Sequence, residues 1–240
     1  MIECALSIVG IDLYNTCTKT HNSPASASQL LTRDPNGEPR LQNWNYRFAV
    51  GCLPYIQAMM RPDSTMAVQQ FARFCNDPKR EHEAAVKWVC RYLLKTKEKG
   101  MIFKPNQVRG LECFVDADWA GSWQPTHANN PSSAHSRSGY VIIHVDCPIV
   151  WATKMQSLIA FSTTEAKYIA LSTVLLEVIE LMNLIDELWT CDFKFHSDKS
   201  KVRCKTFEDN QSCIEIATNH KARPQTKNLS VLLHHFLSYC

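Results

Sequence analysis

The spacing of the apolar residues changes near Met101, and this change constrains the fold more than any other feature of the chain. Before it, apolar residues recur at helical spacing, which is typical of helices that bury one face. The segments with this spacing are Asn43–Gln57, Asp63–Cys75 and Arg80–Thr96. We therefore expect residues 1–100 to form a helical region.

After Met101 the runs of apolar and β-branched residues are short, and polar or proline-containing turns separate them. This pattern predicts three sequential strands that pair antiparallel. The strands are expected at Leu111–Asp118, Gly139–Val145 and Ile149–Ala152.

A long apolar stripe follows these strands and predicts the longest helix, over Ser162–Trp189. A short strand ending at Glu208 precedes a helix that begins at Asp209, and a last helix is expected from Pro224. Helices followed by the order βββαβα predict an α/β fold with a mixed sheet.

Two polar segments predict loops. Asn15–Gln42 contains three prolines and a Pro-Asn-Gly turn, and we expect an extended connector there. Gln124–Ser138 is rich in Asn, Pro and Ser and should be an exposed loop.

The opening residues, 1–12, have the pattern of a short amphipathic helix. Pro54 is expected to kink or end the helix that contains it.

Composition excludes several classes of protein. The chain has 7 glycines in 240 residues and contains neither G-x-G-x-x-G nor G-K-[ST], which disfavours the common nucleotide-binding enzymes. Its 11 cysteines are odd in number and are never spaced C-x-x-C, so reduced thiols are expected rather than a disulfide framework or a zinc site. The adjacent histidines His234 and His235 also lack a partner at metal-ligand spacing.

Charge is distributed unevenly. Residues 1–110 hold 15 Lys and Arg against 9 Asp and Glu, whereas residues 111–240 hold 11 against 14. The basic side chains of Lys87, Arg91 and Lys95 recur every fourth residue, which fits either a solvated helix face or a surface that contacts phosphates.

The start of the chain carries no basic leader, and no run approaches about 18 apolar residues. We therefore expect a soluble intracellular protein, cytoplasmic or nuclear, with no membrane partner.

Three carboxylates fall where predicted elements meet: Asp116, Glu165 and Asp209. Each has a structural explanation, because Asp116 can end an edge strand, Glu165 completes a capping box with Ser162, and Asp209 is a good helix N-cap. Together they suggest a site at the carboxyl ends of the strands. Carboxylates that converge repel one another unless cations offset them, and Mg²⁺ prefers such oxygen ligands.

Five ordered motifs over about a hundred residues resemble the ribonuclease H domain of copia-type retrotransposon polyproteins. They are FVDADWAGS (114–122), SRSGYVII (136–143), CPIVWATKMQS (147–157), STTEAKYIALS (162–172) and FEDNQSCIEIA (207–217). Upstream, the segments NWNYRFAVGCLPYI (43–56) and 61–100 resemble the end of the same family's reverse transcriptase, its thumb and connecting region. The resemblance covers nearly the whole chain.

This resemblance implies a ribonuclease H fold that cleaves the RNA strand of RNA:DNA hybrids with two metal ions, Mg²⁺ or Mn²⁺. It implies that Asp116 bridges both ions, that Glu165 is the helix carboxylate and that Asp209 is the carboxylate after the fourth strand. Asp118 competes with Asp116 because both lie on the same face of their strand.

Contacts with nucleic acid are assigned to polar residues beside the carboxylates: Lys154, Gln156, Thr163, Thr164 and Asn210. Each of them could instead satisfy a turn or a cap. Trp119 and Trp151 fit the core better than a base-stacking platform.

The chain also departs from the family. The position after Glu165 that is usually acidic holds Lys167, and a residue two positions on lies about 200° round the helix, so we expect it to disturb hybrid contacts little. The polymerase fingers and palm are absent, as are the last strand and the A-D-x-x-T-K segment that supplies a fourth carboxylate. We therefore expect a reverse transcriptase thumb and connection region over 1–100, with a loop at 15–42, and a ribonuclease H-like domain lacking its last strand over 101–240.

Three functions remain open. The first is an active hybrid ribonuclease, impaired by truncation. The second is a noncatalytic retroelement remnant that retains weak nucleic-acid binding. The third is a transposase or integrase of the same fold, and the order Asp, Glu, Asp disfavours it. The expected partners are an RNA:DNA hybrid or other nucleic acid, and other products of the polyprotein.

Overall fold

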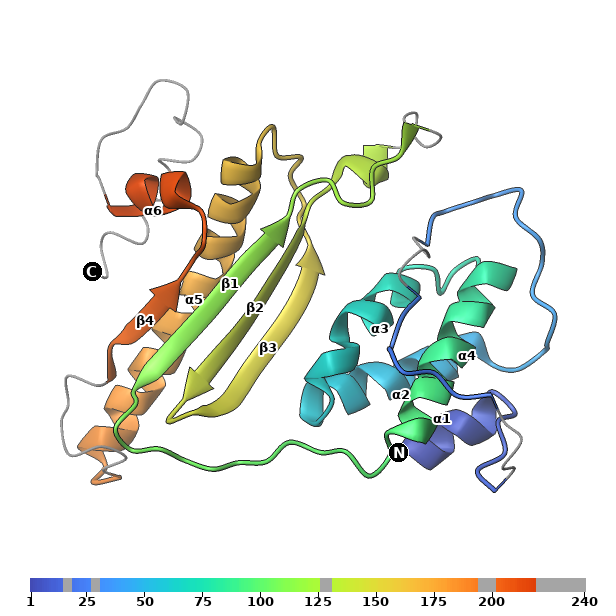
Figure 1. Cartoon of the computed structure of the whole chain (residues 1–240), viewed down its shortest axis with the longest axis horizontal. Coiled ribbons are helices and arrows are strands. Elements are labelled where there is room, and N and C mark those ends of the chain that lie inside the picture. The colour runs from blue at the N-terminus through green and yellow to red at the C-terminus, as the bar shows by residue number, and fades with distance from the viewer. Residues whose placement is uncertain (15–18, 27–30, 126–130, 194–201, 219–240) are drawn as a thin grey trace. The chain divides into compact units, whose positions relative to one another are not determined.

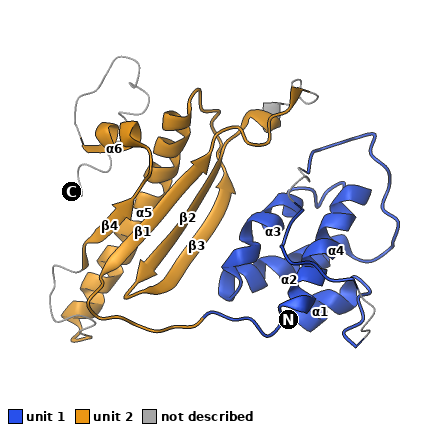
Figure 2. Ribbon diagram, viewed as in Figure 1, with its two compact units in different colours: residues 1–101 blue, residues 102–240 orange. Residues whose placement is uncertain are grey.

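The computed structural model describes residues 1–14, 19–26, 31–125, 131–193 and 202–218. The chain divides into two compact units, Met1–Met101 and Ile102–Cys240 (Figure 2). The helix expected from Pro224, the pair His234 and His235, and the middle of the loop at 124–138 lie outside the described residues. The nine cysteines that the structure describes are all free thiols.

The first unit is helical, as its apolar spacing predicts (Figure 1). Its elements are α1 (Ile2–Ile8), α2 (Tyr46–Met59), the 3₁₀ turn η1 (Pro62–Ser64), α3 (Thr65–Ala72) and α4 (Arg80–Lys95). The expected helix end at Pro54 is wrong, because α2 continues through Pro54 to Met59. Leu53 and Ile56 on either side of the proline are 1% and 2% exposed, so burial of this face holds the helix together past it.

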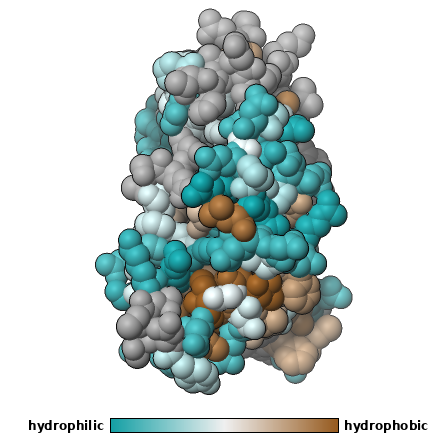
Figure 3. All heavy atoms as spheres, turned by 90° about the vertical axis from the view of Figure 1, so that its right-hand side faces the viewer, coloured by the Kyte–Doolittle hydropathy of each residue, from teal (hydrophilic) through white to brown (hydrophobic). Residues whose placement is uncertain are grey.

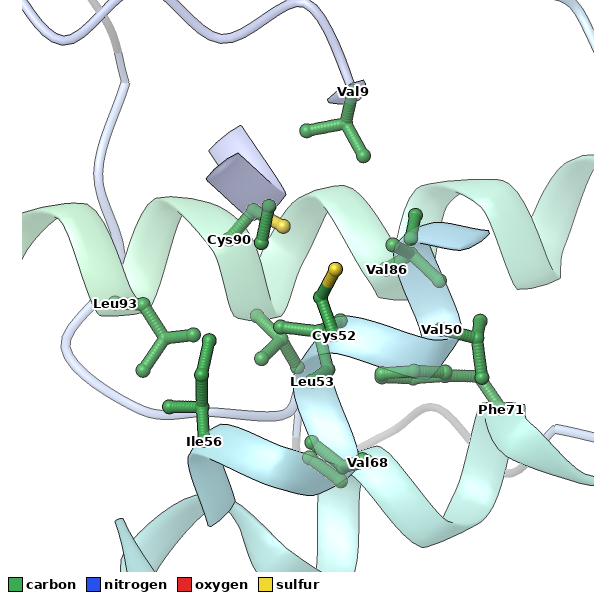
Figure 4. Packing of buried hydrophobic residues seen from close by; sticks show 14 of the residues in the cluster. Val9, Val50, Cys52, Leu53, Ile56, Val68, Phe71, Val86, Cys90 and Leu93 are labelled. Carbon is green, nitrogen blue, oxygen red and sulfur yellow. The ribbon is translucent and has the colours of Figure 1, made fainter. Parts of the chain in front are cut away.

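The core of the first unit forms where the apolar stripes of these helices meet (Figure 4). Val86 and Leu93 of α4 are buried against α2 and α3, and Phe71 is completely buried. The basic stripe on α4 is partly used within the unit, since the ammonium of Lys87 lies 2.8 Å from the carboxylate of Glu83.

The surface in Figure 3 is largely hydrophilic, and hydrophobic residues gather in small patches on it. In α2, the side chains of Phe48, Tyr55 and Met59 are more than half exposed. Their spacing places them on one side of the helix, opposite the stripe that the core buries. The first unit therefore has an ordinary mixed surface.

A partly buried ion pair at η1 is joined to the end of α4. The guanidinium of Arg61, 3% exposed, donates to both carboxylate oxygens of Asp63 at 3.0 and 2.7 Å, and to the carbonyl and hydroxyl oxygens of Thr96 at 3.1 and 2.7 Å. The hydroxyl of Tyr92 donates to the same carboxylate. Partial burial by itself raises the pKa of Asp63, but the hydrogen bonds from Arg61 and Tyr92 outweigh it and hold this pKa below its usual value.

We predict that Asp63→Asn lowers the free energy of unfolding by about 1 to 3 kcal/mol at pH 7, allowing for the partial exposure of Asp63. The folded pKa is depressed, so the stabilisation is present above the unfolded pKa of about 3.9 and is lost as the pH falls through both values. The deficit of the variant should therefore shrink towards pH 3. Urea unfolding over a pH series measures this, with Glu98→Gln as the exposed control. A deficit independent of pH would contradict it.

The second unit is an α/β unit with a four-stranded mixed sheet (Figure 1). Its strands are β1 (Leu111–Asp118), β2 (Arg137–His144), β3 (Cys147–Met155) and β4 (Cys204–Phe207). The spatial order is β3-β2-β1-β4, in which the first three strands pair antiparallel and β4 is parallel to β1. The antiparallel pairing expected of the three sequential strands is confirmed.

One helix, α5 (Thr163–Thr190), covers one face of this sheet (Figure 1). The inward residues of β1 alternate along the strand and are buried together with the apolar stripe of α5. They are Leu111, Cys113, Val115 and Ala117 from β1, and Ala166, Ala170, Val174 and Val178 from α5. Among the described helices α5 alone is long and apolar enough to cross a membrane, and this core packing accounts for its apolar character.

Boundaries differ from the sequence expectation most at β3, which extends beyond Ile149–Ala152 at both ends, and at β2, which begins at Arg137, inside the segment expected to be a loop. They also differ after β4. The helix after it, α6 (Gln211–Thr218), begins two residues later than predicted. Asn210 rather than Asp209 caps it, since Oδ1 of Asn210 accepts a hydrogen bond from the backbone N–H of Cys213 at 2.9 Å. The side chain of Asp209 is therefore not needed as the cap of α6.

Candidate carboxylate site

The parallel register of β1 and β4 brings two of the expected site residues together. Phe114 lies opposite Phe207, and their rings stack with centroids 4.6 Å apart. Two residues further along the chain from each of them come Asp116, still inside β1, and Asp209, beyond the end of β4. Their side chains are 74% and 77% exposed. The two carboxylates thus lie at the edge of the sheet where the parallel strands end.

A lysine from α5 lies between these two carboxylates. Nζ of Lys167 lies 2.6 Å from Oδ1 of Asp116 and donates a hydrogen bond to Oδ1 of Asp209. It also lies 3.5 Å from Oε1 of Glu208. The side chain of Lys167 is only 13% exposed.

This position of Lys167 corrects the expectation that it points away from the site. The rotation of about 200° was counted from Glu165, and Glu165 itself does not face Asp116. Oε2 of Glu165 accepts a hydrogen bond from the backbone N–H of Phe161 at 2.8 Å. Its own backbone N–H donates to Oγ of Ser162 at 3.1 Å. Glu165 and Ser162 therefore cap the start of α5, and position 167 faces the carboxylates.

Sequence reasoning missed Glu208. Its Oε1 accepts hydrogen bonds from the backbone N–H groups of Asp209 and Asn210 at 3.0 and 3.1 Å. The side chain is 3% exposed, and Oε2 is buried without a hydrogen-bond partner among the described residues. The sequence signal that could have identified Glu208 is its position next to Asp209. Neighbouring residues at a strand end point to opposite faces, so the two carboxylates are expected to have different surroundings.

The pKa values reflect this crowding. Burial raises the pKa of Glu208, and the neighbouring Asp209 raises it further. The hydrogen bond from Lys167 lowers the pKa of Asp209 below its usual value. Partial burial by itself lowers the pKa of Lys167, but the carboxylates of Asp116 and Asp209 outweigh burial and raise it. Lys167 is therefore a fixed positive charge in an acidic cluster.

Asp118, the competitor of Asp116, lies elsewhere. A Cβ atom on Gly121 would lie 2.0 Å from Oδ2 of Asp118, so this carboxylate packs against the backbone of the following turn. Within the described residues, the ion pairs of Lys167 are with Asp116, Glu208 and Asp209, and Asp118 is not among them. The geometry favours Asp116 as the strand residue of the cluster.

The expected nucleic-acid contacts divide into buried and exposed residues. The side-chain amide of Gln156 is buried and donates to Oγ of Ser138 at 3.0 Å and to the carbonyl of Ala166 at 2.8 Å, so it joins β3 to β2 and α5. Asn210 caps α6. Lys154 and Thr163 are exposed and could reach a ligand.

The structure exposes Trp119, so the expectation that this tryptophan fits the core is wrong. Trp119 is 46% exposed and donates from Nε1 to the carbonyl of Ala160 at 3.0 Å. Trp151 and Thr164 are partly buried. The indole of Trp119 is therefore held by the protein and presents only part of its surface to solvent.

Comparison with known proteins identifies the chain's relatives. Over 189 residues, 79% of this chain, it is 34% identical to the retrovirus-related Pol polyprotein from transposon TNT 1-94 of Nicotiana tabacum. It is 34% identical over 143 residues to the Pol polyprotein from transposon RE1 of Arabidopsis thaliana. It is also 35% identical over 142 residues to the secreted RxLR effector protein 161 of Plasmopara viticola, a match that covers 94% of that protein.

An α/β unit with a carboxylate cluster at the end of its sheet, joined to a helical unit, thus has its relatives among retroelement proteins. The chain belongs to the retrovirus-related Pol polyproteins of copia-type retrotransposons. It spans 13% of the TNT 1-94 polyprotein and 9% of the RE1 polyprotein. No protein-family model and no solved structure matches it.

The capping role of Glu165 can be tested by substitution. We predict that Glu165→Ala and Ser162→Ala each lower the free energy of unfolding by about 0.5 to 2 kcal/mol, because each removes a hydrogen bond at the start of α5. Chemical denaturation of the full chain measures the loss. Glu180→Ala, in the middle of α5, is the control for removal of a helix glutamate. Equal stability of wild type and both capping variants would contradict the role.

Proposed function

We propose that the second unit is a ribonuclease H-like domain of a copia-type Pol polyprotein and that it binds RNA:DNA hybrids without cleaving them. Its relatives and its element order, three antiparallel strands followed by helix, strand and helix, support the class of domain. The position of Lys167 between Asp116 and Asp209 carries the second part of the proposal.

The Mg²⁺ or Mn²⁺ ions that the resemblance implies do not fit these residues as they are arranged. A site for two divalent ions needs carboxylate oxygens that converge on open positions. Here an ammonium group takes the position between Asp116 and Asp209, and Glu165 accepts a backbone hydrogen bond at the helix start. Within the described residues, no group of three or more His, Cys, Asp and Glu side chains is arranged to hold a metal.

Binding of a hybrid remains compatible with the site. Lys167 offsets part of the negative charge of the carboxylates and so reduces their repulsion of phosphates. Exposed Lys154 can contact the backbone of a nucleic acid, and the register aligns it with Ser138 and Ala117 on the face of the sheet that packs on α5. The exposed stack of Phe114 and Phe207 lies on the opposite face, with Asp116. The basic excess of residues 1–110 adds long-range attraction.

On this proposal the chain acts inside the cell, in the cytoplasm or nucleus, together with its nucleic-acid partner and the other products of the polyprotein.

The thumb and connection role of residues 1–100 is part of the same proposal, and it rests on the upstream motifs. An active hybrid ribonuclease is the competing function.

We predict that the full chain binds a fluorescein-labelled RNA:DNA hybrid in fluorescence anisotropy, with an affinity that falls as salt rises. Lys154→Ala should weaken binding and reduce the slope of log affinity against log salt by about 1. Lys104→Ala, an exposed lysine before β1, is the matched control. The RNA strand should stay intact on a denaturing gel with Mg²⁺ or Mn²⁺.

Two outcomes would overturn the proposal. Cleavage of the RNA strand that Asp116→Asn abolishes would show an active ribonuclease. Absence of hybrid binding at low salt by the folded chain would remove the binding function.

A further inference from the structure

Three carboxylates and one ammonium meet at the end of the sheet. Asp116 comes from β1, Glu208 and Asp209 come from the connection between β4 and α6, and Lys167 comes from α5. The ammonium lies 2.6 Å from Asp116 and 3.5 Å from Glu208, and it contacts Asp209. Carboxylates this close repel one another unless a cation lies between them.

The ammonium is held in place by its surroundings. Its neighbours Ala166 and Tyr168 in α5 are 0% and 2% exposed, which fixes the orientation of this helical turn. On the other side, the side chain of Glu208 is 3% exposed, and its Oε2 has no hydrogen-bond partner in the described part of the chain. A buried carboxylate oxygen without a donor is a ligand atom that a cation could use.

We infer that Lys167 takes the place of a divalent cation in a cluster made by Asp116, Glu208 and Asp209, and that the charge at position 167 decides whether this cluster binds metal. The cluster does not include Glu165. This inference deepens the part of the proposed function that excludes metal ions from the site, and it does not depend on hybrid binding, since its test uses no nucleic acid.

Replacement of Lys167 changes the charge between the three carboxylates. Lys167→Met removes the cation and leaves three carboxylates whose oxygens can turn to a metal. Lys167→Glu also adds a fourth carboxylate at the same position. Carboxylate oxygens in this number suit Mg²⁺ and Mn²⁺, which are hard cations.

The experiment measures binding of Mn²⁺ to the full chain by electron paramagnetic resonance of the free ion and by calorimetry. Wild type should not bind Mn²⁺ at millimolar concentration. Lys167→Met should bind it weakly, and Lys167→Glu should bind it at least about tenfold more tightly than Lys167→Met, because opposite charges attract strongly at this separation. Circular dichroism with and without Mn²⁺ verifies that each variant is folded.

Four further substitutions test the position of the site and its ligands. Lys104→Glu makes the same charge change at an exposed lysine outside the cluster and should create no site. In the Lys167→Glu background, Asp116→Asn or Glu208→Gln should weaken binding at least about tenfold, since each removes one charged ligand. Glu165→Gln in that background should leave the affinity unchanged.

Each opposite result would overturn the inference. Binding of Mn²⁺ by wild type that is sensitive to Asp116→Asn would show that Lys167 does not exclude the metal. If the Lys167→Met variant is folded and binds no more Mn²⁺ than wild type, the ammonium does not occupy a metal-binding position. This variant still tests the inference if Lys167→Glu fails to fold. Loss of binding through Glu165→Gln would return Glu165 to the cluster.

Discussion

The parallel pairing of β4 with β1 is the constraint on which the candidate site depends. It places Phe114 opposite Phe207, and both chains then continue past the paired region in the same direction. Asp116 and Asp209 lie two residues beyond that pair, so they reach the same edge of the sheet. β1 is held between β2 and β4, and its inner face packs on α5. A shift of one residue in the register would move one carboxylate to the opposite face.

The ammonium of Lys167 converts this acidic edge into a structural junction. It joins α5 to β1 and to the segment that leads into α6, and the lowered pKa of Asp209 expresses the same attraction. Glu208 is buried beside it, and burial raises its pKa. A charged pair that is partly buried limits which arrangements of these elements are favourable, because a separated charge would lose its partner without regaining full hydration.

The relatives add a point about the size of this segment. The chain spans a small part of the plant Pol polyproteins that it matches. The match to the Plasmopara viticola effector protein covers nearly all of that protein. Similarity to this chain thus extends to a protein that is much shorter than the Pol polyproteins. Membership of the family establishes descent, whereas activity depends on the particular side chains at the end of the sheet.

The sequence by itself determined the helical first region, the order of strands and helices after Met101, and the residue range of β1. It also determined the family. The spacing of apolar residues and the ordered motifs are local properties of the chain, so they can be read without the structure. The passage of α2 through Pro54 could not be predicted, since burial of Leu53 and Ile56 overrides a local preference. The composition of the cluster was also decided only by tertiary structure. Glu165 and Lys167 are two residues apart, and which of them faces Asp116 depends on how α5 packs on the sheet and how β4 pairs with β1. Those are contacts between residues far apart in the chain, and no local pattern encodes them.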